Sequence, residues 1–437
     1  MTSWLLFALS LLGVALTLNA YRPPRLEVLS VFTFFNGWLI SEMPVQTALG
    51  QAVVTAVLVA LGALHHTAGW AGLAIAAVSW IGLLGLVRRA ALAGPVLQSA
   101  LDEALPAGWR TGLPNRTSVR AGWRERAQLI VPFFMHDRRV EVVRNVDYWG
   151  DGRHAHRLDI YRPREGNGHS PVLVYIHGGG WVIGDKREQG KPMMLHLASL
   201  GWVCVTINYR LSPKATWPDH LVDCKRALDW VRGHIADYGG DASFVAVSGG
   251  SAGGHLAALV GLDPHTAVDA CVPFYGVYDF TNRDGLRGFG FGRFIERMVL
   301  KKRLSEAPEL FRDASPMDQI APGAPPFFVV HGANDTLVPV GEARAFVRLL
   351  RAAATRPVAY AELPGAQHAF EVFRSIRTAF AVDAVADFLE YVRAAGGDQT
   401  PAAFSSSAMD AVKSSASSHT SGIDSRQAIS PTSMRSM

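Results

Sequence analysis

Cysteine is scarce in this chain: three of its 437 residues are cysteines, and they are Cys204, Cys224 and Cys271. An odd and sparse set at core-like positions argues against a disulfide scaffold, and we expect the three side chains to be small, buried and apolar. None of them lies in a nucleophile-type turn or beside a candidate base, so the sequence predicts no catalytic thiol.

Charge is missing from much of the N-terminal region. No Lys, Arg, Asp or Glu occurs from Val45 through Val87, although a helix of a soluble core normally carries a charged face. Val45–Leu64 and Gly69–Val87 each approach the length of about 20 residues that spans a bilayer. Trp4–Leu18 is a further, mostly apolar stretch. We therefore predict about three membrane-spanning helices within residues 1–90.

A shorter apolar stretch, Val28–Ile40, has about 13 residues and contains Asn36 and Gly37. Because it is short, we expect an interfacial or re-entrant piece, or an extension of a neighbouring helix; a fourth span is the alternative. A cleaved signal peptide is the alternative for Trp4–Leu18, but that segment lacks the positively charged start of a signal peptide.

Arginines indicate the orientation of the predicted spans. Arg22 and Arg25 follow the first span, and Arg88 and Arg89 follow the third, whereas the turn at His65–His66 has no Lys or Arg. Positive residues accumulate on the cytoplasmic side of a membrane. With three spans, the N-terminus is therefore expected outside and the domain at residues 136–398 in the cytoplasm.

Strand patterns alternate with helix patterns between residues 136 and 398. The predicted strands are Arg157–Tyr161, Val172–Ile176, Trp202–Asn208, Phe244–Val247, Val268–Phe274, Phe327–Val330 and Val358–Glu362. The helical patterns include Leu221–Ile235, Gly341–Ala353 and Thr378–Ala394. Such alternation predicts an α/β fold with a mostly parallel sheet covered on both faces. Residues 91–135 are expected to form a connector or N-terminal cap helices, and the Ser-rich residues 399–437 are expected to be disordered.

Residues 249–253 read Gly-Gly-Ser-Ala-Gly, and they lie between the strand pattern Ser243–Val247 and a helix pattern. A G-x-S-x-G run at such a junction is typical of a strained turn that lifts the serine hydroxyl clear of the sheet. Glycines are needed on both sides because a Cβ there would clash with the neighbouring strand and helix. Since small-residue runs also match this pattern by chance, Ser251 is a candidate nucleophile only if its partners follow.

A serine hydroxyl needs a base that a third group orients. The run Pro325–Asp335 reads as a buried strand that ends in a loop carrying Asp335, and Pro357–Leu363 is a strand followed by a loop with His368. The order serine, acid, histidine is that of an α/β-hydrolase. An Asx-turn for Asp335 and a solvated loop for His368 are the alternatives, but the order and the strand-end positions together predict a triad with Ser251.

Residues 177–181 read His-Gly-Gly-Gly-Trp, directly after the central strand pattern Pro171–Ile176. Loops of this type present backbone N–H groups to the oxygen that becomes negative during acyl transfer, together with the N–H that follows the nucleophile. The candidate oxyanion-hole residues are therefore Gly178, Gly179, Gly180 and Ala252. A phosphate-binding loop is the alternative, but the lysine and Ser/Thr of a P-loop are missing.

These motifs resemble the hormone-sensitive-lipase-like branch of the α/β-hydrolase esterases, particularly bacterial membrane-associated carboxylesterases. The resemblance covers roughly residues 136 to 396 and also rests on Asn-Tyr-Arg-Leu-Ser-Pro at 208–213 and Tyr-Gly-Gly-Asp at 238–241. It implies an α/β-hydrolase fold with Ser251 as nucleophile, His368 as base and Asp335 as the residue that orients the base. Gly250 is a departure, because many members carry an aspartate there, and it leaves the acyl-chain preference open.

The oxyanion loop is also similar to that of arylformamidases, so hydrolysis of a small amide is the alternative reaction. A ligand-binding protein on a degenerate hydrolase fold is a further alternative, although such a protein would be expected to have lost His368. The expected reaction is ester hydrolysis through an acyl-enzyme, which needs no metal or organic cofactor. His154 and His156 lie in a charged turn that suggests no third metal ligand.

The formal net charge of +5 is shared between loops and membrane flanks, and no nucleic-acid motif accompanies it. Membrane lipid is therefore the expected partner, with a small lipophilic ester as substrate. The basic segment Arg293–Arg303 is expected to be either a surface helix or an amphipathic piece that lies on anionic lipid.

Overall fold

The structure is a computed structural model that describes residues 1–24, 30–113, 132, 135–166 and 168–397. The Ser-rich tail predicted at 399–437 lies outside the described residues, as do residues 114–131 and 133–134 of the predicted connector. Met1–Arg393 form one compact unit, which contains both the N-terminal helices and the sheet.

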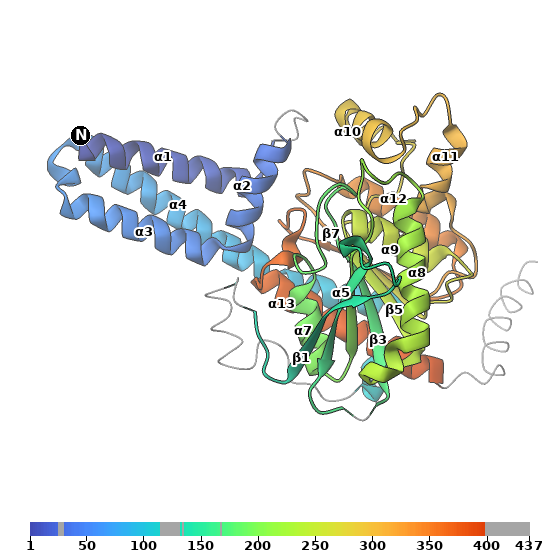
Figure 1. The fold of residues 1–437 in the computed structure, drawn as a ribbon. Coiled ribbons are helices and arrows are strands. Elements are labelled where there is room, and N and C mark those ends of the chain that lie inside the picture. The colour runs from blue at the N-terminus through green and yellow to red at the C-terminus, as the bar shows by residue number, and fades with distance from the viewer. Residues whose placement is uncertain (25–29, 114–131, 133–134, 167, 398–437) are drawn as a thin grey trace, which may run out of the picture. The chain divides into compact units, whose positions relative to one another are not determined.

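Eight strands form one sheet in the order β1-β2-β4-β3-β5-β6-β7-β8 (Figure 1). β2 pairs antiparallel with β1 and β4, and the remaining pairs are parallel. The strands are β1 Val140–Asp147, β2 Arg157–Pro163, β3 Ser170–Ile176, β4 Val203–Ile207, β5 Gly240–Gly250, β6 Ala270–Phe274, β7 Phe327–Gly332 and β8 Val358–Leu363. The predicted strands are present as β2 to β8, whereas β1, a partly exposed edge strand, was not predicted.

The two faces of the sheet bury alternate side chains, because successive side chains of a strand point to opposite faces. In β3, Val172, Val174 and Ile176 belong to one apolar layer, and Leu173 and Tyr175 belong to the other. A parallel sheet is buried on both faces, so β3 reads as a continuous apolar run rather than as an alternating pattern.

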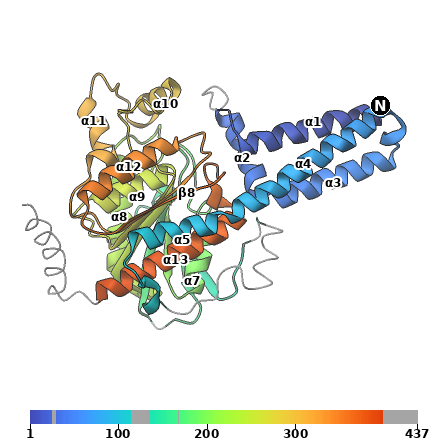
Figure 2. The ribbon, with the colours of Figure 1, turned by 180° about the vertical axis from the view of Figure 1, so that it is seen from behind.

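Helices cover both faces of the sheet (Figures 1 and 2). The layer that contains Val172 is completed by α8, α9 and α12, and the opposite layer by α5, α7 and α13. Their bounds are α5 Ala93–Ala104, α7 Lys191–Ser199, α8 Asp219–His234, α9 Ala252–Leu262, α12 Val340–Ala353 and α13 Ile376–Gly397. The predicted α/β architecture is therefore present. α5 falls within the predicted connector or cap, and its Leu97 and Leu101 are buried in the second layer.

Four further helices precede α5, namely α1 Thr2–Tyr21, α2 Ser30–Glu42, α3 Pro44–Ala60 and α4 Thr67–Ala91. α1 and α4 pack closely, since a Cβ on Gly72 would lie 2.8 Å from the backbone nitrogen of Phe7. Further along the same contact, the hydroxyl oxygens of Thr17 and Ser79 are 3.0 Å apart. Small and hydroxylated residues at a helix contact are typical of helices that associate in lipid.

By length and composition, two of the described helical stretches could cross a bilayer, α1 and the stretch Thr67–Ala104 that contains α4 and α5. α2 and α3 together would give a third if they formed one span, but they are bent by 92° at their junction. α3 alone has 17 residues, which corresponds to about 26 Å of helix. Large apolar side chains are exposed on α1, α3 and α4, among them Leu12, Val53, Val57, Ile81 and Leu84.

The bend between α2 and α3 has a local cause in the sequence. A proline disfavours the helical conformation in the residue before it, and its own fixed φ suits the first turn of a helix. Pro44 accordingly opens α3, and Met43 before it has φ −125°. The chain therefore changes direction at Met43, and α2 does not continue along α3.

α2 is held against the sheet domain. Glu42 and Arg377 are both buried and form an ion pair with 2.6 Å between Oε1 and Nη1. One turn earlier, the indole N–H of Trp38 donates to the carbonyl oxygen of Ala369 at 2.8 Å. From Ser30 onward, the predicted interfacial or re-entrant stretch is thus a helix docked next to the loop that carries His368, and its residues 28 and 29 lie outside the described residues.

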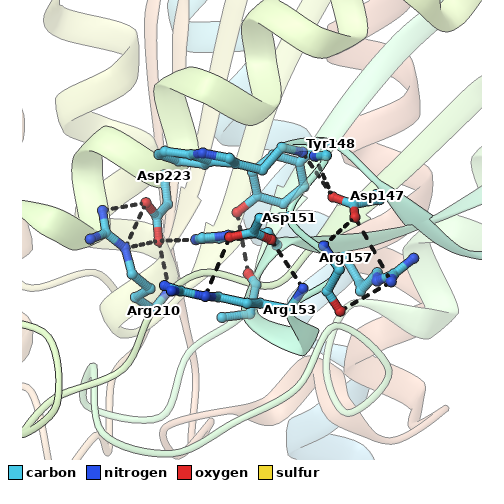
Figure 3. A network of polar contacts seen from close by, with 12 residues as sticks. Asp147, Tyr148, Asp151, Arg153, Arg157, Arg210 and Asp223 are labelled. Atoms are coloured by element: carbon cyan, nitrogen blue, oxygen red, sulfur yellow. Dashed lines mark hydrogen bonds and ion pairs between the residues drawn. The ribbon is translucent and has the colours of Figure 1, made fainter.

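A polar network fixes the connection between β1 and β2 against α8 (Figure 3). His156 Nδ1 lies 2.7 Å from Asp151 Oδ2, and His156 Nε2 lies 3.6 Å from Asp223 Oδ2. Arg210 pairs with the same Asp223, with 2.7 Å between Nη2 and Oδ1, whereas His154 is exposed. Among the residues that the structure describes, no group of three or more His, Cys, Asp or Glu could hold a metal ion.

The basic segment predicted at Arg293–Arg303 includes the end of the short helix α10, Phe289–Phe294, and the π-helix Ile295–Val299. The side chains of Ile295 and Val299 are buried, whereas that of Phe289 is exposed. The segment thus has a buried apolar side and a basic outer side.

Candidate active site

Ser251 lies at the junction of β5 and α9. Its backbone angles are φ 57° and ψ −119°, and a residue with a Cβ adopts such a conformation at a cost of about 1–3 kcal/mol. Glycines make the turn possible, because a Cβ on Gly253 would lie 2.0 Å from the carbonyl oxygen of Ile176, and one on Gly249 would lie 2.6 Å from it. The strand-to-helix turn expected from the glycine-rich run is therefore present.

The structure brings Ser251, His368 and Asp335 together. His368 Nε2 lies 2.8 Å from Ser251 Oγ, and His368 Nδ1 lies 2.7 Å from Asp335 Oδ2. A carboxylate can only accept, so Nδ1 carries the proton and Nε2 presents its lone pair to the serine hydroxyl. Asp335 follows β7 and His368 follows β8, so both lie at the carboxyl end of the parallel sheet, where such folds place their ligands.

Both oxygens of Asp335 are engaged. Oδ1 accepts the backbone N–H groups of Leu337 and Val338 at 2.9 and 2.8 Å, and Oδ2 lies 3.2 Å from His331 Nε2 as well as facing His368. Burial raises the pKa of Asp335, but the two histidines and their hydrogen bonds outweigh burial and hold the pKa well below its usual value. The Asx-turn alternative and the triad contact coexist, because each uses a different oxygen.

The glycine loop after β3 passes beside Ser251. Gly179 has φ 115°, and a Cβ on it would lie 2.0 Å from the carbonyl oxygen of Ile183, so only glycine fits there. The N–H of Gly178 donates to Gln189 Oε1 at 2.7 Å, whereas Gly179 and Gly180 line the cavity next to Ser251. Gly178 is one of the predicted oxyanion-hole residues, but its N–H is already bonded to the side chain of Gln189.

A cavity of about 1050 Å³ opens beside Ser251 and His368. Its lining is mostly apolar and comes from α2, from the segment that leads into α10, and from the loop after Asp335; the α2 residues are Ser30, Val31, Phe34, Phe35 and Trp38. No sequence signal indicates that α2 reaches Ser251 and His368, because its aromatic residues read equally well as a membrane-associated stretch.

Glu371 is a second residue that sequence reasoning missed. Its carboxylate is buried and accepts hydrogen bonds from Tyr175 Oη, at 3.0 Å, and from Tyr275 Oη. Burial raises the pKa of Glu371, opposed by these tyrosine hydroxyls and by the charge of His368. A Cβ on Gly250 would lie 2.6 Å from Tyr275 Oη and 3.1 Å from Glu371 Oε1. The space beside Gly250 is thus already occupied by Tyr275 and Glu371.

Gln367 joins the two loops that carry the acid and the base. Its Oε1 accepts the backbone N–H of Thr336 at 2.9 Å and that of His368 at 3.1 Å. It therefore fixes the spacing between Asp335 and His368 by way of their neighbours. Nothing in the sequence distinguishes this glutamine from other loop residues, because its role depends only on the distant contact.

Two other histidines near the site are structural. Burial lowers the pKa of His177 to about 4 and that of His255 to about 3, so both are neutral near pH 7. His255 Nε2 donates to the carbonyl oxygen of Ala314 at 2.7 Å, and its Nδ1 accepts the indole N–H of Trp181 at 3.2 Å. His368 is the histidine that contacts Ser251.

The chain is similar to known esterases. The BD-FAE family model matches residues 158–350. The probable carboxylic ester hydrolase LipM of Mycobacterium tuberculosis is 42% identical over 427 residues, covering 89% of this chain and 94% of LipM. The esterase LipQ of the same organism is 39% identical, covering 81% of this chain and 83% of LipQ. A truncated carbohydrate esterase from gut microbiota shares the fold, with a TM-score of 0.50 at 24% identity over 58% of this chain and 96% of that one.

Proposed function

The chain belongs to the hormone-sensitive-lipase-like carboxylic ester hydrolases of the α/β-hydrolase fold, and on that premise we propose that Ser251, His368 and Asp335 are its catalytic triad. The observation that carries the proposal is the continuous line of contacts from the serine hydroxyl through the imidazole to the buried carboxylate. The curated relatives are ester hydrolases, which favours an ester over the small-amide alternative.

In the first half of the reaction, Ser251 Oγ attacks the ester carbonyl carbon while His368 Nε2 takes the hydroxyl proton. The carbonyl oxygen becomes negative and accepts hydrogen bonds from the N–H groups of Gly179, Gly180 and Ala252. Each such donor stabilises the transition state by about 3–4 kcal/mol. Gly178 serves differently, because its N–H holds Gln189 and so shapes the loop.

The imidazolium then donates its proton to the leaving alkoxide oxygen, the ester C–O bond breaks, and the acyl group remains on Ser251. In the second half, water attacks the acyl carbon while His368 takes a proton from it, and the serine oxygen leaves with that proton. One ester and one water thus give one acid and one alcohol. Throughout, Asp335 holds the imidazole tautomer and stabilises its positive form.

We further propose that α1, α3 and α4 cross a membrane and that the substrate is a lipophilic ester. The exposed apolar side chains of these helices support the crossing, and the apolar cavity beside Ser251 supports the substrate class. α3 and α4 form a hairpin that returns the chain to the side it left, so α2 and the catalytic domain share one side. The arginines after α1 and within the last turn of α4, Arg22, Arg88 and Arg89, make that side the cytoplasm.

The test compares Ser251→Ala with Ser248→Ala in the full-length protein in detergent micelles. Ser248 is a buried serine near the end of β5, and its hydroxyl donates to the carbonyl oxygen of Val272. We expect Ser251→Ala to lose both p-nitrophenyl butyrate hydrolysis and labelling by a fluorophosphonate, and Ser248→Ala to keep both. Undiminished turnover by a folded Ser251→Ala variant would refute the assignment.

A further inference from the structure

One wall of the active-site cavity is built by α2. The cavity residues Val31, Phe34, Phe35 and Trp38 of this helix have the spacing i, i+3, i+4, i+7, which places them on one face of a helix. Phe34 reaches the base itself, since its ring packs edge-on against the imidazole of His368 with 6.0 Å between ring centres. An acyl chain bound to Ser251 would therefore lie against this face.

Apolar residues outside α2 also line the cavity. Leu286, Phe291 and Phe294 lie in and before α10, Val338 lies in the loop after Asp335, and Val340 is the first residue of α12. At about 1050 Å³, the cavity matches the upper end of the range of about 300–1,000 Å³ in which proteins enclose drug-sized ligands. A cavity of this size and lining suits a long hydrocarbon chain better than a short or polar acyl group.

The α2 wall is open toward the outside of the protein. Val31 and Phe35 line the cavity, yet their side chains are 58% and 52% exposed, and Phe32 on the outer face is 66% exposed. A helix that shows phenylalanines on both its cavity face and its outer face is unsuited to water, and it fits the boundary between headgroups and acyl chains. The 92° bend to α3 lays α2 along the membrane plane when α3 crosses the bilayer.

α2 is a fixed wall, because it is anchored along its length. Thr336 Oγ1 donates to the carbonyl oxygen of Ser30 at 3.3 Å near its start, and Trp38 donates to Ala369 in its second half. At its end, Glu42 forms the buried ion pair with Arg377. The exposed rim formed by Val31 and Phe35 thus belongs to an anchored helix.

We propose that α2 is the acyl-binding wall and that the substrate is a long-chain ester which reaches Ser251 sideways from the bilayer, between Val31 and Phe35. This inference rests on the serine hydrolase mechanism proposed above and adds the class of substrate and its route. For a chain that is transferred from water, each methylene buried in the cavity favours binding by about fourfold, so the cavity holds a long acyl chain more tightly than a short one. An ester that already lies in a bilayer reaches the cavity without its chain crossing water.

The first experiment tests the wall with the full-length protein in detergent micelles, using p-nitrophenyl butyrate and p-nitrophenyl hexadecanoate. Phe35→Ser removes an aromatic ring from the cavity face, and we expect the hexadecanoate-to-butyrate ratio of kcat/KM to fall about tenfold. Phe32→Ser is the matched control, because Phe32 is on the same helix but does not line the cavity, and its ratio should equal that of the wild type. The same ratio in all three proteins would overturn the acyl wall.

The second experiment tests the route with protein reconstituted in phosphatidylcholine vesicles. p-Nitrophenyl hexadecanoate is placed either in the same vesicles as the protein or in a separate population, at equal bulk concentration. A faster initial rate from the same vesicles supports access from the bilayer, whereas equal initial rates would overturn it. Ser251→Ala distinguishes failure of the catalytic proposal from failure of this inference. If Ser251→Ala still hydrolyses p-nitrophenyl butyrate, the catalytic proposal fails. If Ser251→Ala is inactive but the chain-length and vesicle effects are missing in the other proteins, only this inference fails.

Discussion

Asp335→Asn keeps the size of the side chain and removes the carboxylate that orients His368. The asparagine oxygen can still accept the N–H groups of Leu337 and Val338, which Oδ1 accepts in the native site. The amide NH₂ must then occupy the position of Oδ2 beside His368 Nδ1. Because NH₂ is a donor, Nδ1 has to accept and the imidazole proton moves to Nε2. The ring then points an N–H at Ser251 and cannot take the hydroxyl proton.

The expected loss follows from this tautomer. In serine hydrolases the wrong tautomer lowers kcat by about 10⁴-fold, which corresponds to about 5 kcal/mol of transition-state stabilisation. Asp335→Ala should lose a similar factor and should also be less stable, because the backbone N–H groups of Leu337 and Val338 then lack their acceptor. An unsatisfied buried donor costs about 1–3 kcal/mol. The two variants therefore separate orientation of the base from support of the loop.

The assay is kcat for p-nitrophenyl butyrate with the full-length protein in detergent, alongside thermal unfolding of each variant. We expect Asp335→Asn to unfold near the wild-type temperature with kcat reduced by about 10⁴-fold. A folded Asp335→Asn variant that retains more than a tenth of the wild-type kcat would refute the role assigned to Asp335. Loss of folding in both variants would instead assign the carboxylate mainly to stability.

Acid should destabilise the protein. Burial lowers the pKa of His177 to about 4 and that of His255 to about 3, so at mildly acidic pH these histidines are protonated in the unfolded chain but neutral in the folded chain. Stability should fall as pH drops from about 6.5 to about 4, by about 1.4 kcal/mol per pH unit and histidine; a constant melting temperature from pH 7 to pH 5 would contradict this. Glu371→Gln removes a buried acidic group that interacts with the base, so we expect the acid limb of the pH–rate profile to move to lower pH, and an unchanged profile would exclude that influence. Glu42→Gln leaves the charge of Arg377 buried without its partner and should lower the free energy of unfolding by about 3–5 kcal/mol, measured by chemical denaturation. The double variant with Arg377→Met should regain part of this stability, and no regain would contradict a stabilising ion pair.

The candidate nucleophile, acid and base could be identified from the sequence because each has a local signal. The spacing of glycines around Ser251 reflects steric contacts within the turn itself. Asp335 and His368 follow runs whose apolar, β-branched composition predicts strands. The carboxyl ends of parallel strands meet at one edge of a sheet, so chain order was sufficient to expect these residues together.

The role of α2 and that of Glu371 could not be predicted, because both depend on contacts between distant parts of the chain. Trp38 bonds to a residue 331 positions away, and Glu371 accepts from Tyr175, which is 196 positions away. The apolar composition of α2 indicates only that the helix is not surrounded by water. A bilayer and a protein cavity are both consistent with that composition. β1 escaped prediction for a different reason, since an edge strand that is partly exposed lacks the apolar run that marks β3.

The N-terminal helices take part in the geometry of the catalytic loops. Asn334 Nδ2 lies 3.2 Å from the carbonyl oxygens at the end of α1, and Thr336 bonds to the start of α2, so both neighbours of Asp335 are held by the helical region. Trp38 holds Ala369, directly after His368. Misplacement of a catalytic group by about 1 Å can cost about a hundredfold in rate. The contacts that place α2 against the cavity are therefore the same contacts that keep Asp335 and His368 in register, and the helical region is a structural part of the candidate active site.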